Sequence, residues 1–172
     1  MRRVSRGDRD AFAAIAATHG PAIERFVLRL LVQRQRAEEV LQETLMKAWR
    51  EAARYDPDRA RLSTWLHQIA HNLCIDILRR QRREQPLTEN ADTIIGSDEN
   101  PETLVQIGET QRQVAAAVSA LSQRHRTALI LTYYQSLPNR DVSQIMGISV
   151  RALESLLVRA RRELKTILEE SR

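Results

Sequence analysis

The stretch from Asn139 to Leu164 constrains the fold more than any other part of the sequence. Apolar residues recur at helical spacing before Gly147 and again after Ser149. Gly147 can adopt the left-handed conformation of a tight turn, Ile148 can fill the corner, and Ser149 is suited to cap the second helix. This order is typical of a helix-turn-helix unit. The predicted buried residues are Val142, Ile145 and Met146 in the first helix, then Leu153, Leu157, Ala160 and Leu164 in the second.

The other side of the second helix combines basic residues with one acid. Arg151, Glu154, Ser155, Val158 and Arg162 share one helical face. Arginine and serine can contact base edges or phosphates, and glutamate can accept a hydrogen bond from a cytosine amine. We therefore predict contacts with DNA by Arg151, Glu154 and Ser155, with phosphate charge from Arg159, Arg161, Arg162 and Lys165. Two plainer interpretations stay open: Glu154 pairs with Arg151 or Arg162 as an ordinary surface residue, or the stretch is a simple helical hairpin.

Composition favours helices in the rest of the chain as well. Only five of the 172 residues are glycine and five are proline, which fits poorly with a turn-rich sheet protein. We predict an all-α fold of two small helical domains joined by an acidic linker. The expected helices are Asp8 to Thr18, Pro21 to Val32 after a break at Gly20, Arg36 to Arg54, Ser63 or Thr64 to Arg83, Thr110 to Ala120, Ser122 to Tyr134, Asn139 to Met146, and Ser149 to Glu170.

Charge divides the chain into three blocks. The net charge is +7 over residues 1 to 83, −7 over 84 to 110, and +5 over 111 to 172. We predict domains at 1–84 and 111–172 with a linker at 85–110. Two basic bodies suggest a polyanionic partner, most commonly nucleic acid. The alternative is that the arginine-rich helices are merely solvated.

Two further helical faces are unusual. One polar face of the helix that ends near residue 83 contains Asn72, Asp76, Arg79, Arg80 and Arg83. Both a DNA-facing surface and a solvated amphipathic helix would show this spacing. By contrast, an acidic face within this basic domain would repel DNA and suits a basic protein partner. That face contains Glu38, Glu39, Gln42 and Glu43.

Several function classes are disfavoured. The chain has no phosphate-binding loop or nucleophile motif, so we expect no enzymatic activity and no cofactor. His67, His71 and Cys74 have a spacing that could offer three zinc ligands, but a structural site needs a fourth, so we predict no metal and a buried Cys74. A single cysteine, no signal peptide and no apolar run of transmembrane length lead us to expect a cytoplasmic protein with no membrane insertion.

Taken together, these segments resemble the extracytoplasmic function (ECF) sigma factors, the small members of the sigma-70 family. The stretches "GDRDAFAAI", "RAEEVLQETLMKAWR", "YDPDRARLSTWLHQIAHNLCIDILRR" and "LSQRHRTALILTYYQSLPNRDVSQIMGISVRALESLLVRARREL" follow in that family's order. The resemblance implies a two-domain initiation subunit, made of region 2 and region 4. Such a subunit binds core RNA polymerase, directs it to promoter DNA and helps to melt it, commonly under control of an anti-sigma factor, with no small-molecule substrate.

The resemblance also implies roles for individual positions. Glu38, Glu39, Gln42, Glu43 and Thr44 correspond to the polymerase-docking surface, and the loop from Asp56 to Ser63 to the segment that captures a base flipped from the −10 element. The predicted −10 contacts are Asp56, Arg59, Arg61, Ser63, Trp65, Asn72, Asp76, Arg79, Arg80 and Arg83. The helix from Ser149 to Arg162 corresponds to the −35 reader, with predicted contacts Ser149, Arg151, Glu154, Ser155, Arg159 and Arg162. The acidic linker corresponds to a connector that threads through the polymerase.

This sequence departs from the family pattern at three places. Arg36 stands where an aspartate is usual, Ser143 replaces a common alanine, and Glu154 and Leu156 replace a lysine and an arginine of the reading helix. The promoter sequence that this chain prefers therefore cannot be inferred from its relatives. Two other classes stay open: a stand-alone helix-turn-helix regulator, and a protein-interaction decoy that mimics a sigma factor. The sequence also leaves open whether the two domains are apart or packed together.

Overall fold

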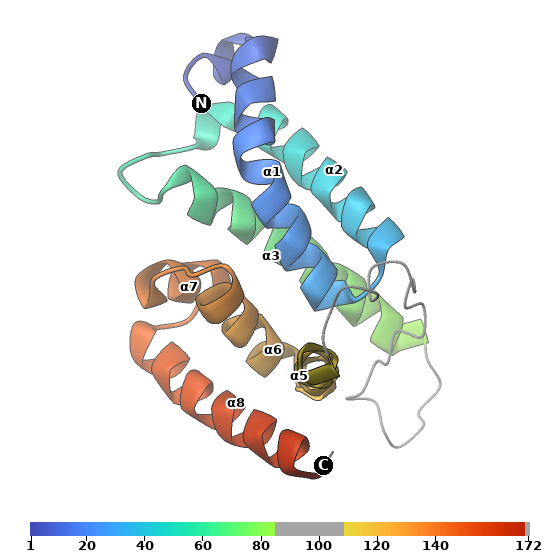
Figure 1. Ribbon diagram of the computed structural model, residues 1–172. Helices are drawn as coiled ribbons and strands as arrows, with labels where there is room; N and C mark the ends of the chain where they lie inside the picture. Colours follow the sequence, from blue (N-terminus) through green and yellow to red (C-terminus); the bar gives the residue numbers. More distant parts are fainter. Residues whose placement is uncertain (85–108, 171–172) are drawn as a thin grey trace.

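The computed structural model describes residues 1–84 and 109–170, and all regular elements within these ranges are helical (Figure 1). The N-terminal set is α1 (Arg9–Leu31), α2 (Arg34–Arg50) and α3 (Leu62–Glu84), with 3₁₀ turns η1 (Val4–Arg6) and η2 (Ala52–Arg54). The C-terminal set is α5 (Glu109–Ala120), α6 (Gln123–Leu129), a π-helical turn η3 (Ile130–Tyr134), α7 (Asn139–Met146) and α8 (Val150–Glu170). The all-α prediction is confirmed. Most of the predicted linker, residues 85–108, lies outside the described residues.

The predicted break at Gly20 and Pro21 is wrong, because α1 continues through both residues. A proline inside a helix removes one backbone hydrogen bond and costs about 3 kcal/mol. Packing on both sides of Pro21 offsets this cost. Before it, the ring of Phe12 meets that of Trp49 at 5.1 Å; after it, Phe26 is fully buried.

The core of the N-terminal set forms where α1, α2 and α3 meet. Apolar residues at helical spacing on each helix face the other two, as the sequence pattern predicts. Fully burying side chains of this size stabilises the fold by roughly 2 kcal/mol each. The side chains with no exposed surface include those of Ile23, Phe26, Val27, Leu30 and Leu66. This core fixes the outward faces of α2 and α3.

The C-terminal set contains the predicted helix-turn-helix. Gly147 has φ 64°, the left-handed conformation expected for the turn after α7. Ser149 Oγ accepts a hydrogen bond from the Ala152 backbone at 3.1 Å, which confirms the predicted cap of α8. Leu153, Leu157 and Ala160 are buried as predicted, whereas Leu164 is half-buried. The predicted cap at Ser63 or Thr64 is wrong, since α3 already begins at Leu62.

The two sets pack against each other, with α5 to α8 gathered beneath α3 in the view of Figure 1. Helix α7 lies against α3, and α6 and η3 lie against α1. Buried residues of both sets belong to one continuous apolar cluster. In this structure the two sets are therefore closed on one another.

Candidate nucleic-acid and protein-binding surfaces

Helix α2 presents the predicted acidic face to solvent. Glu38, Glu39, Gln42 and Glu43 are all exposed, and Ala37, Val40 and Ala48 hold the opposite side of α2 in the core. Arg50 donates to Glu43 Oε1 at 3.1 Å, which partly neutralises one end of the face. Met46 is 48 % exposed and adds an apolar side chain that was not predicted from the sequence. The surface is thus suited to a partner that presents basic side chains next to an apolar one.

Thr44 does not belong to this surface. It is completely buried, and its hydroxyl donates to the Val40 carbonyl oxygen at 2.7 Å. The helix rotates by about 100° per residue, so Thr44 points to the opposite side from Gln42. The prediction that Thr44 contacts a partner is therefore corrected: Thr44 packs beneath the acidic face of α2.

The loop between η2 and α3 is folded around Asp56. The Asp56 carboxylate accepts the backbone N–H of Asp58 at 2.9 Å and lies 3.7 Å from the Arg59 guanidinium. Tyr55 donates its hydroxyl to the Ala60 carbonyl at 3.1 Å, and its ring lies 5.3 Å from that of Trp65. These contacts hold the loop next to the Tyr55 and Trp65 rings. Of the other predicted loop residues, Arg61 is exposed and Ser63 is half-buried.

The polar face predicted for α3 is present and points to solvent. Arg79 donates to Asp76 at 2.9 Å, so one acid on this face orients one base. Because the pair is largely exposed, its contribution to stability is small. The face ends in a basic last turn and contains the exposed residues Asn72, Asp76, Arg79, Arg80 and Arg83.

The His67, His71 and Cys74 triplet lies on the buried side of α3 instead. Burial lowers the pKa of both histidines and raises the pKa of the Cys74 thiol to about 12. His67 Nδ1 bonds to the Ser63 carbonyl at 2.8 Å, and its ring lies 5.6 Å from that of Phe26. Among the described residues, no three His, Cys, Asp or Glu side chains are arranged to hold a metal ion.

Helix α8 exposes every residue predicted for its reading face. Within residues 1–84 and 109–170, neither Arg151 nor Glu154 forms an ion pair. The alternative in which Glu154 pairs with Arg151 or Arg162 is therefore not observed. Val158 is 41 % exposed on the same face. An unpaired acid beside an unpaired base leaves both free for an external partner.

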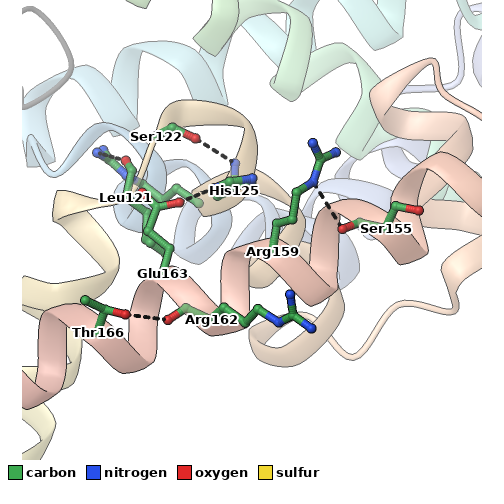
Figure 2. A network of polar contacts seen from close by, with 9 residues as sticks. Leu121, Ser122, His125, Ser155, Arg159, Arg162, Glu163 and Thr166 are labelled. Carbon is green, nitrogen blue, oxygen red and sulfur yellow. Dashed lines mark hydrogen bonds and ion pairs between the residues drawn. The ribbon is translucent and has the colours of Figure 1, made fainter.

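Figure 2 shows how the basic side chains of α8 are held. Arg159 Nε donates to the Ser155 carbonyl oxygen at 3.4 Å, and the Thr166 hydroxyl donates to the backbone carbonyl oxygen of Arg162 at 3.2 Å. His125 of α6 contacts Glu163 of α8, which fixes α8 on the rest of the set. This contact was not predicted from the sequence, because two residues 38 positions apart show no local pattern.

The comparisons with known proteins decide the family. The model of sigma-70 region 2 matches residues 15–84, and that of sigma-70 region 4 matches residues 111–164. The chain is 33 % identical over 150 residues to the ECF RNA polymerase sigma factor SigM of Bacillus subtilis, covering 84 % of this chain and 87 % of the relative. This chain belongs to the ECF sigma factors. It is therefore a transcription initiation factor of the sigma-70 family.

Further relatives of this sigma factor match along its whole length. It is 28 % identical to SigW of B. subtilis, covering 99 % of this chain and 95 % of SigW. RpoE of Bartonella quintana, solved with the anti-sigma factor NepR, superposes with a TM-score of 0.72 at 25 % identity, covering 94 % and 99 % of the two chains. CnrH, solved with the cytosolic domain of CnrY, superposes at 0.76 with 22 % identity, covering 99 % and 96 %, and supports the fold.

The part of the chain that the structure describes includes no helix with the length and hydropathy needed to cross a membrane.

Proposed function

We propose that this sigma factor binds core RNA polymerase, directs it to specific promoters and promotes melting of the DNA there. The observation that carries the proposal is the presence of three outward faces of different chemistry on one chain: an acidic one on α2 and two largely basic ones on α3 and α8. The protein contributes recognition and leaves catalysis to the polymerase. We place it in the cytoplasm, with the polymerase.

The acidic face of α2 is the proposed polymerase-docking surface. Glu38, Glu39, Gln42 and Glu43 are exposed on a rigid helix whose other side is fixed in the core. Charge complementarity of this kind favours a basic partner and speeds association. It also keeps this side of region 2 away from DNA, so the protein approaches its two partners with different faces.

The loop from Asp56 to Ser63, Trp65 and the polar face of α3 form the proposed −10 surface. Extruding a base costs a few kcal/mol, so a site that receives the base offsets part of the melting. The Tyr55 and Trp65 rings adjoin the loop and can stack on a base. Arg79, Arg80 and Arg83 are placed to hold the backbone of the opened strand.

Helix α8 is the proposed −35 reader. Its first turns lie at the helix N-terminus, where recognition helices contact base edges. Arg151 supplies hydrogen-bond donors and Glu154 supplies acceptors, and the Ser155 hydroxyl can both donate and accept. Arg159 and Arg162 follow on the same side and suit phosphates.

An anti-sigma factor is the proposed regulator. The support is the likeness of this whole chain to RpoE of B. quintana, which was solved in complex with the anti-sigma factor NepR. Nothing among the residues described here selects the type of anti-sigma factor, so we propose the class of partner alone.

Run-off transcription tests the proposal. Purified core polymerase is supplied with a library of promoter fragments, with and without the protein. Transcripts that start at defined positions only when the protein is present are expected. Sequence-specific binding of duplex DNA by the chain, with no effect on the polymerase, would instead identify a stand-alone helix-turn-helix regulator. Polymerase binding with no initiation on any promoter would identify a decoy.

A further inference from the structure

We propose that region 2 has a second nucleic-acid site, formed by η1, η2 and the last turn of α2. This site receives one unpaired base of the opened strand just downstream of the −10 element, and arginines at its rim hold the neighbouring phosphates. The inference rests on the function proposed above, because it extends the proposed −10 surface. Its residues lie outside the loop and outside α3, which form that surface.

The site is a hollow between η1 and η2. These two turns lie against each other, and η1 also lies against α2 (Figure 1). The hollow has a volume of about 290 Å³. This value is near the lower end of the roughly 300 to 1,000 Å³ found for ligand pockets, which suits a single base better than a larger ligand. The residues around it include Ser5, Gly7, Trp49, Arg50 and Ala53.

Trp49 gives the hollow an aromatic wall. Its ring makes an edge-to-face contact with that of Phe12 at 5.1 Å, which fixes the indole from the side of α1. The Ser5 hydroxyl donates to the Arg2 carbonyl oxygen at 2.9 Å, so its oxygen is left to accept from a base. No atom lies within 4 Å of the place where a Cβ on Gly7 would be, so this side of the hollow is open. An unpaired base can enter there and meet an aromatic ring.

Arginines surround the opening of the hollow. Residues 1–10 contain four arginines and two aspartates, and residues 49–54 contain two arginines and one glutamate. Arg2, Arg6 and Arg54 are exposed. Among the described residues, Arg2 and Arg6 form no ion pair, and Arg54 has one exposed pair at 4.0 Å, which contributes little. These guanidinium groups are therefore available to phosphates.

The hollow adjoins the loop of the proposed −10 surface. Ala53 borders the hollow, and Tyr55, whose ring lies beside that of Trp65, follows two positions later, within about 7 Å along the chain. A strand that leaves the loop therefore reaches the hollow within a few nucleotides. The last turn of α3 leads along the chain to region 4, which takes the upstream −35 element in the proposed function. The loop end of α3 accordingly faces downstream, as the proposal requires.

The chemistry of the hollow differs from that of the acidic face of α2. A basic rim beside an aromatic ring is the combination used by single-strand binding sites. The border between the two surfaces is an ion pair, because Arg50 lines the hollow and donates at 3.1 Å to Glu43, which belongs to the acidic face. An acidic protein is the competing partner for a basic rim, and the experiments below distinguish it from DNA.

Forked promoter fragments test the proposal with the holoenzyme. Each fragment is taken from a promoter selected by run-off transcription, is duplex up to the −10 element, and continues downstream as an unpaired, labelled tail. A matched fragment ends at the −10 element. Abasic nucleotides are placed at each tail position in turn, and one position should weaken binding about tenfold, as expected for a lost base–aromatic stack. Equal effects along the tail, or no effect at any position, would overturn the base site.

A variant that fills the hollow tests where that base binds. Ala53→Leu enlarges an exposed lining side chain and leaves all the arginines in place. Binding of the intact tail should weaken about tenfold, and the abasic nucleotide should have no further effect. The tail-free fragment should bind as it does to the wild type, which shows that region 2 is folded. If the abasic effect persists in Ala53→Leu, the base does not bind in this hollow.

The rim is tested by Arg6→Glu/Arg54→Glu. Affinity for the tailed fragment should fall about tenfold, and the slope of log K against log salt concentration should become shallower by about 1.4, or about 0.7 for each phosphate contact of a single strand. Arg25→Glu/Arg124→Glu makes the same charge change at exposed positions away from the hollow and should keep the wild-type response to the tail. Weaker binding of core polymerase by Arg6→Glu/Arg54→Glu, with an unchanged response to the tail, would identify an acidic protein partner and overturn the proposal.

The tail-free fragment separates failure of the second site from failure of the proposed function. If the wild-type holoenzyme binds the tail-free fragment and the tail adds no affinity, the second site is refuted while the proposed function stands. If the wild-type holoenzyme binds neither fragment, the assignment of the −10 surface fails, and the second site fails with it.

Discussion

The guanidinium of Arg126 reaches across the interface between the two helical sets and donates to the carbonyl oxygen of Leu30 at 3.3 Å. The same group donates to Leu121 at 3.1 Å and to Ser119. No carboxylate pairs with it among the described residues, and burial lowers its pKa. A buried cation is thus held by backbone carbonyls alone, two of them in its own set and one at the end of α1.

Arg126→Ala should lower the free energy of unfolding by about 3 kcal/mol, because buried carbonyl oxygens lose a charged donor and the site loses its packing. Arg126→Lys keeps the charge but not the forked geometry, so its loss should be intermediate. Urea denaturation followed by circular dichroism measures both. Arg124→Ala, at an exposed position of α6, should change stability by less than about 0.5 kcal/mol. Equal values for the variants at 126 and 124 would contradict the structural role.

Glu39→Arg should weaken binding to core polymerase about tenfold, which corresponds to about 1.4 kcal/mol, because it reverses a charge within the proposed docking surface. Binding to duplex −35 DNA should be unchanged, since the proposed −35 surface is on α8. Fluorescence titration against labelled core polymerase and labelled duplex measures the two affinities. Glu170→Arg, an equal charge reversal at the end of α8, should leave polymerase affinity as it is. Wild-type polymerase affinity in Glu39→Arg would refute the assignment of α2.

Glu154→Lys should change which −35 sequence is bound more than the total amount of DNA bound. The unpaired carboxylate can accept from a cytosine amine, whereas lysine prefers the acceptors of guanine. Selection from a randomised −35 library should show a change at one position, worth about 1 to 3 kcal/mol of discrimination. Glu170→Lys is the control for added positive charge. A uniform increase in binding to all sequences would show that Glu154 does not read bases.

Stability should fall as the pH drops below about 6.5. Burial lowers the pKa of His67 and His71 in the folded protein, so the unfolded chain binds protons that the folded chain excludes. The stabilisation from the neutral rings is fully present above the unfolded value and is lost progressively below it, by at most about 1.4 kcal/mol per pH unit for each histidine. Urea unfolding between pH 7.5 and 5.5 measures the slope. In the variant His67→Gln/His71→Gln, the free energy of unfolding should depend less steeply on pH. The half-buried His19 is present in both proteins, so its contribution cancels when the two slopes are compared. An identical slope would contradict this account.

Local sequence signals determined the elements that the sequence predicted well. The bounds of α7 and the cap of α8 depend on residues within three positions, such as Gly147 and Ser149, whose preferences act without tertiary help. The exposed faces of α3 and α8 followed from helical spacing alone. Buried Cys74 was also predicted, because it falls on the apolar side of α3.

The errors arose where distant packing outweighs local preference. Pro21 suggested a break, but contacts of Phe12 and Phe26 with other helices keep α1 continuous. Thr64 looked like a cap, and it instead bonds to Asp141 from 77 positions away. The closed arrangement of the two sets could not be predicted, because Arg126, Gln144 and Tyr134 carry no local sign of a partner in the other set. The role of each site residue remains a prediction for the experiments above.

Permanganate reactivity of promoter thymines tests the central claim most directly, namely that this sigma factor lets the polymerase open DNA at chosen sites. On a promoter selected by run-off transcription, the account predicts reactive, unpaired thymines around the −10 element with core polymerase and the protein together. Core polymerase alone and the protein alone should leave the same thymines protected. Protected thymines in the combined sample, with polymerase bound to the fragment, would contradict the account.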